Sequence, residues 1–179
     1  MGSAQPRRIE ERVIRELWLA LVLLGLALAQ AALMPRMLGL APNLLLLLTI
    51  FQALIAGPAN AARWAFYAGL ALDVSADTAL GIHALALLAA VLVAGLILAR
   101  WSRGNWLLPL VGVVLGSLAY HTVLALLTAL LVAPISPRVY ALVVALPATI
   151  LVLVPALPLF LSMRWLEQRR RGEVPFDVY

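Results

Sequence analysis

Residues 42–57 read PNLLLLLTIFQALIAG: a proline and an asparagine open the stretch, an apolar run without a charged side chain follows, and a glycine closes it. Proline suits the first turn of a helix, where a backbone N–H has no helical partner in any case. Gly57 and Pro58 then end the run. The stretch therefore predicts an apolar helix that crosses a membrane.

The rest of the chain has the same character. Of its 179 residues, 65 % are hydrophobic and 12 % are charged, whereas soluble domains are usually about half apolar. A hydrocarbon layer takes about 20 helical residues per crossing, so the length allows about six crossings and no separate soluble domain. We therefore expect an all-α integral membrane protein, a bundle of about six transmembrane helices.

Apolar segments bounded by proline, glycine or arginine give the expected organisation. The predicted spans are residues 17–34, 42–57, 60–72, 80–99, 105–133 and 139–163. The third covers only about half a bilayer, so we expect it to be short, tilted or broken. Residues 1–16 are predicted to be a cytoplasmic interfacial lead-in, 17–163 the transmembrane domain, and 164–179 a basic cytoplasmic tail.

The arginines predict the orientation. With six crossings and a cytoplasmic N-terminus, eleven of the 13 basic residues fall on the inner side, and only Arg36 and Arg138 fall on the outer side. Positive charge gathers on the cytoplasmic side of membrane proteins. We therefore expect a multi-pass protein with both termini in the cytoplasm. The same bias accounts for the net charge of +5, so the lipid bilayer and not nucleic acid is the expected partner.

The chain lacks the residues that several classes of chemistry require. The chain has no cysteine, which excludes disulfides, thiolate metal sites and cysteine nucleophiles. It shows no serine paired with a histidine and an acid at a recognisable spacing, no glycine-rich phosphate loop and no carboxylate cluster within a span. The histidines also lack the spacing of a helical zinc site. We expect neither an enzyme nor a bound metal or cofactor.

Two aspartates stand at the end of the short third segment. Asp73 and Asp77 lie one helical turn apart, and ionisable groups at the edge of lipid are costly enough to suggest a purpose. For Asp73 one interpretation is that it caps or orients the break between the third and fourth segments and contacts a partner on the outer side. The other is an exposed loop carboxylate or helix cap at the outer surface. For Asp77 we favour a plain helix cap at the membrane surface.

Glycines flank that turn and recur in the fifth span. Gly69 and Gly81 are expected either to let helices approach closely or to adopt a backbone conformation that other residues resist. Gly112 and Gly116 form a GxxxG pair, for which packing within the subunit is favoured over an interface.

Polar side chains also follow one face of the fifth span, at Ser117, His121 and Thr128. A proton relay or a ligand contact is one interpretation of His121. A neutral imidazole bonded to a neighbouring helix is the favoured one, and only a contact with Asp73 would reverse that preference. His83 is an equally weak candidate.

Two blocks of sequence resemble a known bacterial family. The first is Pro42-Asn43 followed by an apolar span with Phe51 and Gln52 embedded in it, and the second is GLALDVSADTALGIHALAL at residues 69–87. The stretch from 42 to 95 thereby resembles the rod shape-determining protein MreD family. The length, the six-span plan and the basic ends are similar over nearly the whole chain.

The resemblance implies a non-catalytic scaffold subunit of the cell-wall elongation (rod) complex in the bacterial inner membrane, which supports peptidoglycan synthesis and cell shape. The implied partners are MreC, a bitopic scaffold, and more broadly the filament protein MreB, the glycosyltransferase RodA and a class B penicillin-binding transpeptidase. The expected fold is similar to the substrate-binding subunits of energy-coupling-factor transporters. The structural or interaction candidates of the chain are Pro42, Asn43, Gly69, Asp73, Gly81, Gly112, Gly116 and His121.

The alternative is that the chain is itself the substrate-binding subunit of a vitamin transporter. Pro147, Pro155 and Pro158 are each expected to favour a kink in the sixth span, and a kinked span could line a cavity with the polar face of the fifth. A vitamin site should gather aromatic and polar groups in one pocket. The tryptophans instead fall mostly near the predicted membrane surfaces, where an aromatic belt explains them.

Overall fold

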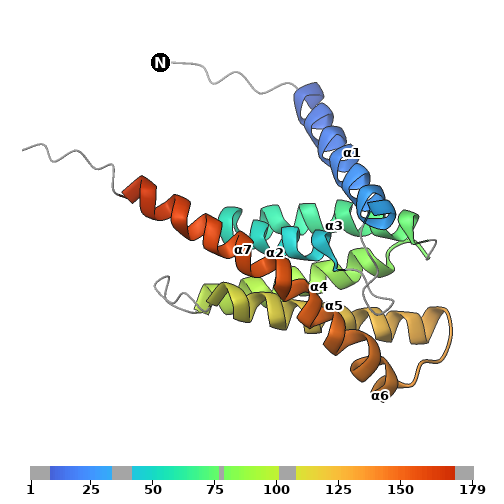
Figure 1. Cartoon of the computed structure of the whole chain (residues 1–179). Coiled ribbons are helices and arrows are strands. Elements are labelled where there is room, and N and C mark those ends of the chain that lie inside the picture. Colours follow the sequence, from blue (N-terminus) through green and yellow to red (C-terminus); the bar gives the residue numbers. More distant parts are fainter. Residues whose placement is uncertain (1–8, 34–41, 77–78, 101–107, 172–179) are drawn as a thin grey trace, which may run out of the picture.

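The computed structural model describes residues 9–33, 42–76, 79–100 and 108–171. All regular structure in these ranges is helical (Figure 1). The elements are α1 (Ile9–Leu33), α2 (Leu44–Ala56), α3 (Pro58–Ser75), α4 (Ile82–Arg100), α5 (Leu108–Leu131), α6 (Pro137–Tyr140), a π-helical turn η1 (Ala141–Ala145) and α7 (Leu146–Arg171). Because α6, η1 and α7 follow one another without a break, the described residues form six helical rods.

Three of these rods are long and apolar enough to cross a membrane. They contain the stretches Val13–Leu33, Pro109–Leu131 and Pro137–Ser162, while α2 and α4 contribute the shorter apolar stretches Leu44–Ala53 and Ile82–Leu96. The predicted all-helical class is confirmed for the described residues, and three helices suited to crossing a membrane fit an integral membrane protein. That all six rods cross stays a prediction.

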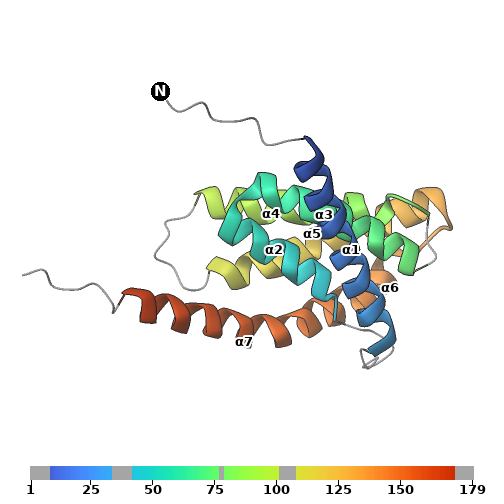
Figure 2. The ribbon, with the colours of Figure 1, turned by 90° about the horizontal axis from the view of Figure 1, so that it is seen from above.

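Helices α2 to α5 form the centre of the bundle, and α1 and α7 flank it (Figures 1 and 2). Helix α4 packs between α3 and α5, α1 leans mainly on α3, and α7 rests mainly on α5. Small residues let neighbouring helices approach closely inside a membrane. The buried small residues of α3 and α4 are Ala61, Ala65, Ala68, Gly69, Ala71, Ala84, Ala86, Ala90 and Ala94.

The expectation that the third segment is short or broken is wrong. Helix α3 is continuous over 18 residues, which is about 27 Å of helix and close to the thickness of a hydrocarbon core. Pro58 stands in its first turn, and Gly57, at φ 84°, lets the chain reverse direction from α2. At the other end the helix continues past Asp73, because the carboxylate finds partners that the sequence did not reveal.

The last rod contains a feature that the sequence analysis did not anticipate. In η1 the N–H of Leu146 donates to the carbonyl of Ala141, five residues earlier. Proline has no N–H to offer the carbonyl four residues before it, and the wide turn ends at Ala145, two residues before Pro147. The chain thus accommodates Pro147 with a π-helical turn, whereas Pro155 and Pro158 lie inside α7.

Candidate functional site

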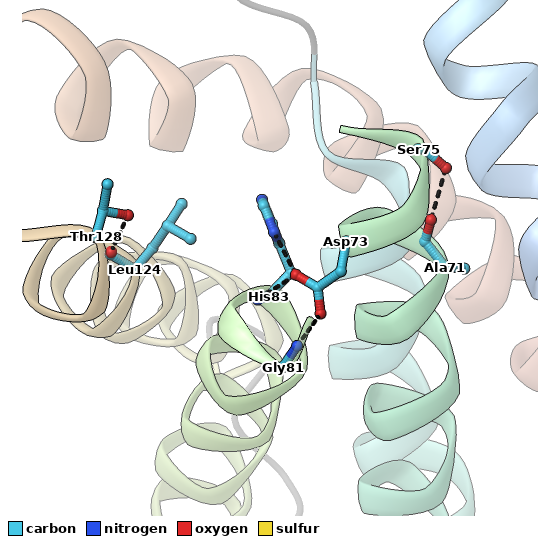
Figure 3. A network of polar contacts seen from close by, with 7 residues as sticks. All are labelled: Ala71, Asp73, Ser75, Gly81, His83, Leu124 and Thr128. Atoms are coloured by element: carbon cyan, nitrogen blue, oxygen red, sulfur yellow. Dashed lines mark hydrogen bonds and ion pairs between the residues drawn. The ribbon is translucent and has the colours of Figure 1, made fainter. Parts of the chain in front are cut away.

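Asp73 closes the turn between α3 and α4, with only 1 % of its surface exposed. Its Oδ2 accepts a hydrogen bond from the N–H of Gly81 at 2.7 Å, and its Oδ1 accepts one from the N–H of His83 at 2.8 Å (Figure 3). The Nδ1 of His83 lies 2.9 Å from the same Oδ1. Since α4 begins at Ile82, the carboxylate of one helix caps the first turn of the next.

The capping geometry explains how a carboxylate is tolerated among apolar helices. The first N–H groups of a helix have no partner within it, and the N-terminal end of the helix dipole attracts negative charge. A hydrogen bond to a charged group contributes about 1.5–3 kcal/mol. Asp73 therefore supplies hydrogen-bond acceptors to the N–H groups at the start of α4, and these N–H groups supply the polar surroundings that the buried carboxylate needs.

The two glycines of this turn contribute in different ways. Gly81 has φ 99°, in the left-handed region that side-chain-bearing residues resist. Gly69 faces α4 so closely that a Cβ built on it would lie 2.1 Å from the Cα of Ala84 and 2.5 Å from its backbone nitrogen. Gly81 therefore allows the chain to turn, and Gly69 allows the two helices to pack.

The start of α2 lies at the same end of the bundle and is capped twice. The Oδ1 of Asn43 accepts from the N–H of Leu46 at 3.0 Å, and the Oε1 of Gln30, on α1, accepts from the N–H of Leu44 at 2.9 Å. Pro42, half-buried, precedes this cap. Gln30 thus links α1 to the start of α2, and Asn43 caps α2 from its own segment.

A second polar seam joins α5 to the last rod. Ser117 Oγ lies 3.0 Å from Thr149 Oγ1, which also donates to the carbonyl of Ala145 at 2.7 Å. One turn along α5, His121 Nδ1 lies 3.4 Å from the Tyr140 hydroxyl. The Nε2 of His121 is buried and has no hydrogen-bond partner in the structure.

Aromatic contacts connect this seam to the Asp73 cap. The ring centroids of His83 and Tyr120 are 6.3 Å apart, those of Tyr120 and His121 are 5.0 Å apart, and those of His121 and Tyr140 are 6.3 Å apart. The contact that would have made His121 a relay candidate is made by His83 instead, because it is His83 that touches Asp73. We call the row Asp73, His83, Tyr120, His121 and Tyr140 the polar row.

The remaining candidates on α5 lie apart from the polar row. A Cβ on Gly116 would lie 2.8 Å from Ile50 Cδ1 and 3.3 Å from the carbonyl oxygen of Ala90, whereas one on Gly112 would meet nothing within 4 Å. Only Gly116 of this GxxxG pair therefore makes a close approach. Thr128 donates to the carbonyl of Leu124 on its own helix (Figure 3).

At the opposite end of the bundle an ion pair ties α1 to α3. Arg63 pairs with Glu16, and the two side chains are 45 % and 29 % exposed. Exposed ion pairs contribute about 0–1 kcal/mol, so this pair positions α1 more than it stabilises the fold.

Four polar groups of these contacts were missed or undervalued in the sequence. The sequence pattern makes His83 no stronger a candidate than His121, and it does not single out Gln30, Tyr140 or Thr149. The only signal for these groups in the sequence is a polar side chain within an apolar segment. Which of these side chains contact one another depends on how the helices pack. Asp77, by contrast, lies outside the described residues, and among those residues no group of three or more His, Asp or Glu side chains could hold a metal ion.

Comparison with known proteins adds one finding. A family model for the rod shape-determining protein MreD matches residues 11–170. This chain belongs to the MreD family. No curated protein and no solved structure matches it, so the similarity to energy-coupling-factor transporter subunits stays a prediction. Membership of the MreD family gives the chain a role in rod-shape determination, and its three apolar helices fit a protein of the inner membrane.

Proposed function

We propose that the chain is a non-catalytic scaffold subunit of the bacterial cell-wall elongation complex, and that it binds MreC through helix faces within the inner membrane. The wider partners are MreB, RodA and a class B penicillin-binding transpeptidase. Family membership supports the role in cell shape. The scaffold role and the MreC contact are proposed on the way this chain uses its polar groups.

The observation that carries the proposal is the use of Asp73. An ionisable side chain within a membrane bundle is by default a candidate for transport or catalysis. Here both carboxylate oxygens are engaged at the start of α4, by Gly81 and His83, and the side chain is fully covered. A group committed to an internal cap favours an architectural role over a chemical one.

The surfaces that remain for a partner are apolar helix faces. Outward leucines recur on α4 at Leu85, Leu92 and Leu96, and similar rows follow α1 and α7. Lipid tails are as apolar as leucine, so membrane helices associate through packing and not through the hydrophobic effect. A partner that carries a membrane helix of its own, as a bitopic scaffold does, matches such faces.

The orientation belongs to the same proposal. Both termini lie in the cytoplasm, with residues 1–16 and 164–179 facing the filament side of the complex, and the α3–α4 turn faces the outer side. Glu16 and Arg63 then lie together near the inner surface and Asp73 near the outer one. Arg63 and Asp73 stand toward opposite ends of α3, so an orientation that places one near the inner surface places the other near the outer surface.

Depletion in the bacterium that encodes the chain tests the proposed role. We expect rods to widen and round up as the protein is lost, and wild type and Gly112→Ala, whose new methyl group meets nothing within 4 Å, to restore cell width. Rods that keep their width and growth rate after complete depletion would refute the scaffold role.

The transporter alternative has one observation in its favour, the unpartnered Nε2 of His121 beside Tyr140. The open groove between α5 and α7, however, is lined by Leu110, Val111, Val114, Leu115, Leu153 and Leu157. Aliphatic walls do not provide the polar groups that orient a vitamin. A vitamin bound stoichiometrically to the purified protein would favour the transporter.

A further inference from the structure

Helices α5 and α7 enclose a groove on the flank of the bundle. All six side chains that line it are aliphatic, four from α5 and two from α7. Leu115 and Leu157 are 39 % and 47 % exposed at its rim, and Val111, Val114 and Leu153 are half-buried along its walls. The groove is therefore open to the surrounding membrane.

The size of the groove selects among apolar occupants. Its volume is about 380 Å³. A helix is about 10 Å across, so a partner's transmembrane helix would cover this groove from outside. A single extended hydrocarbon chain is narrower and can lie between the side chains of α5 and α7.

The position of the groove along α7 gives its depth in the membrane. Thr149 lies at the middle of the span Pro137–Ser162. Leu153 and Leu157 follow by about 6 and 12 Å of helix, within the half-thickness of about 15 Å of the hydrocarbon core. Arg164 follows Thr149 by about 22 Å, which is the level of the lipid headgroups.

The charge of α7 beyond the groove favours an anionic headgroup. The helix continues to Arg171 and carries arginines at 164, 169, 170 and 171, against a single acid, Glu167. An apolar slot that leads, along the same helix, to a basic segment matches an anionic amphiphile at both of its ends.

We propose that the groove between α5 and α7 binds one acyl chain of an anionic phospholipid, whose headgroup lies at the level of Arg164 on α7. In the proposed orientation this is a lipid of the inner leaflet. The site needs no MreC, so its test is independent of the scaffold role.

Native mass spectrometry of the full chain, released from nanodiscs made of equal parts phosphatidylglycerol and phosphatidylcholine, tests the site. We expect one phosphatidylglycerol to stay bound to the wild type. Val114→Trp fills the groove and should abolish this retention, as should Leu157→Phe on the opposite wall. Arg164→Gln should lower phosphatidylglycerol retention about fivefold, because one arginine near an anionic surface contributes about 1 kcal/mol.

The matched control is Leu92→Trp, which adds the same ring to an outward position of α4 that is 59 % exposed. This variant should retain the lipid, and the melting temperatures of all variants establish that each is folded. Equal retention of phosphatidylglycerol by Val114→Trp and Leu92→Trp would overturn the proposal. Equal retention of phosphatidylglycerol and phosphatidylcholine by the wild type would also overturn it. Leu157→Cys that forms a disulfide, in native membranes, with a cysteine placed in the membrane helix of MreC would also overturn the proposal, because the groove would then be occupied by a protein.

Discussion

A Cβ on Gly69 would lie 2.1 Å from the Cα of Ala84, so α3 and α4 touch backbone to backbone one helical turn from the Asp73 cap. The contact and the cap restrain the same pair of helices. The contact does so by close packing of the two backbones, and the cap does so by hydrogen bonds to the Asp73 carboxylate. The packing of the α3–α4 hairpin therefore depends on Gly69 and on Asp73.

Gly69→Ala is expected to destabilise the protein strongly. The new methyl group meets backbone atoms that no rotamer change can move, and overpacking of this kind costs about 1–3 kcal/mol or more. The melting temperature in detergent, followed by fluorescence-detected size exclusion, measures the loss. Ala84→Gly should not rescue the variant, because the Cα and nitrogen of residue 84 remain in place.

Gly112→Ala is the control for that experiment. Its new methyl group meets nothing within 4 Å, and alanine is favoured over glycine within a helix by about 1 kcal/mol. We expect an unchanged or higher melting temperature. If Gly112→Ala lowered the melting temperature as much as Gly69→Ala, the assignment of Gly69 as the close contact would be wrong.

Gly116→Ala should have a smaller effect that a second substitution removes. Its closest neighbour is the tip of a side chain, Ile50 Cδ1 at 2.8 Å, and Ile50→Val deletes that atom. We expect the double variant to melt above Gly116→Ala alone, with an interaction energy of about 0.5–2 kcal/mol in a double-mutant cycle. Simple additivity of the two substitutions would contradict the contact.

Asp73→Ala is expected to lower stability by about 2–6 kcal/mol, because the N–H groups of Gly81 and His83 lose their acceptor and each buried unsatisfied group costs about 1–3 kcal/mol. Asp73→Asn keeps one oxygen acceptor and should fall between alanine and wild type. Ser75→Ala, which removes a bond only to the carbonyl of Ala71 within α3, should change little. Equal melting temperatures for Asp73→Ala and Ser75→Ala would show that the cap is unimportant.

The absence of cysteine allows the proposed orientation to be mapped with single cysteines. Positions 60, 76 and 136 are exposed at helix ends. A membrane-impermeant maleimide added to intact spheroplasts should label Ala76→Cys and Ser136→Cys, and should label Asn60→Cys only after permeabilisation. Labelling of Asn60→Cys from outside would reverse the orientation, and identical behaviour of all three would exclude it.

The sequence was most informative where composition alone decides. The apolar run bounded by Pro42 and Gly57 predicted the two ends of α2 to within two residues, although Pro42 precedes the N-cap Asn43 and does not stand in the first turn. Each of these signals is local, since a proline or a glycine acts on the backbone beside it. The helical class and the limits of α2 followed directly.

The sequence was least informative where two helices meet. The third segment was expected to be short or broken because Arg63 and Asp73 interrupt its apolar pattern, yet α3 is continuous. Its charges are accommodated by partners on α1 and α4, which no local pattern reveals. For the same reason, the sequence does not reveal that His83, and not His121, contacts Asp73.

Co-expression of the tagged chain with the MreC of the same bacterium, followed by purification in mild detergent, tests the scaffold role most directly. We predict a stoichiometric complex that survives size exclusion. Asp73→Asn, Gly112→Ala and Val114→Trp should retain it as long as they fold. A chain that purifies without MreC from membranes containing both, or with a pair of ATPases and a coupling membrane subunit, would contradict the account.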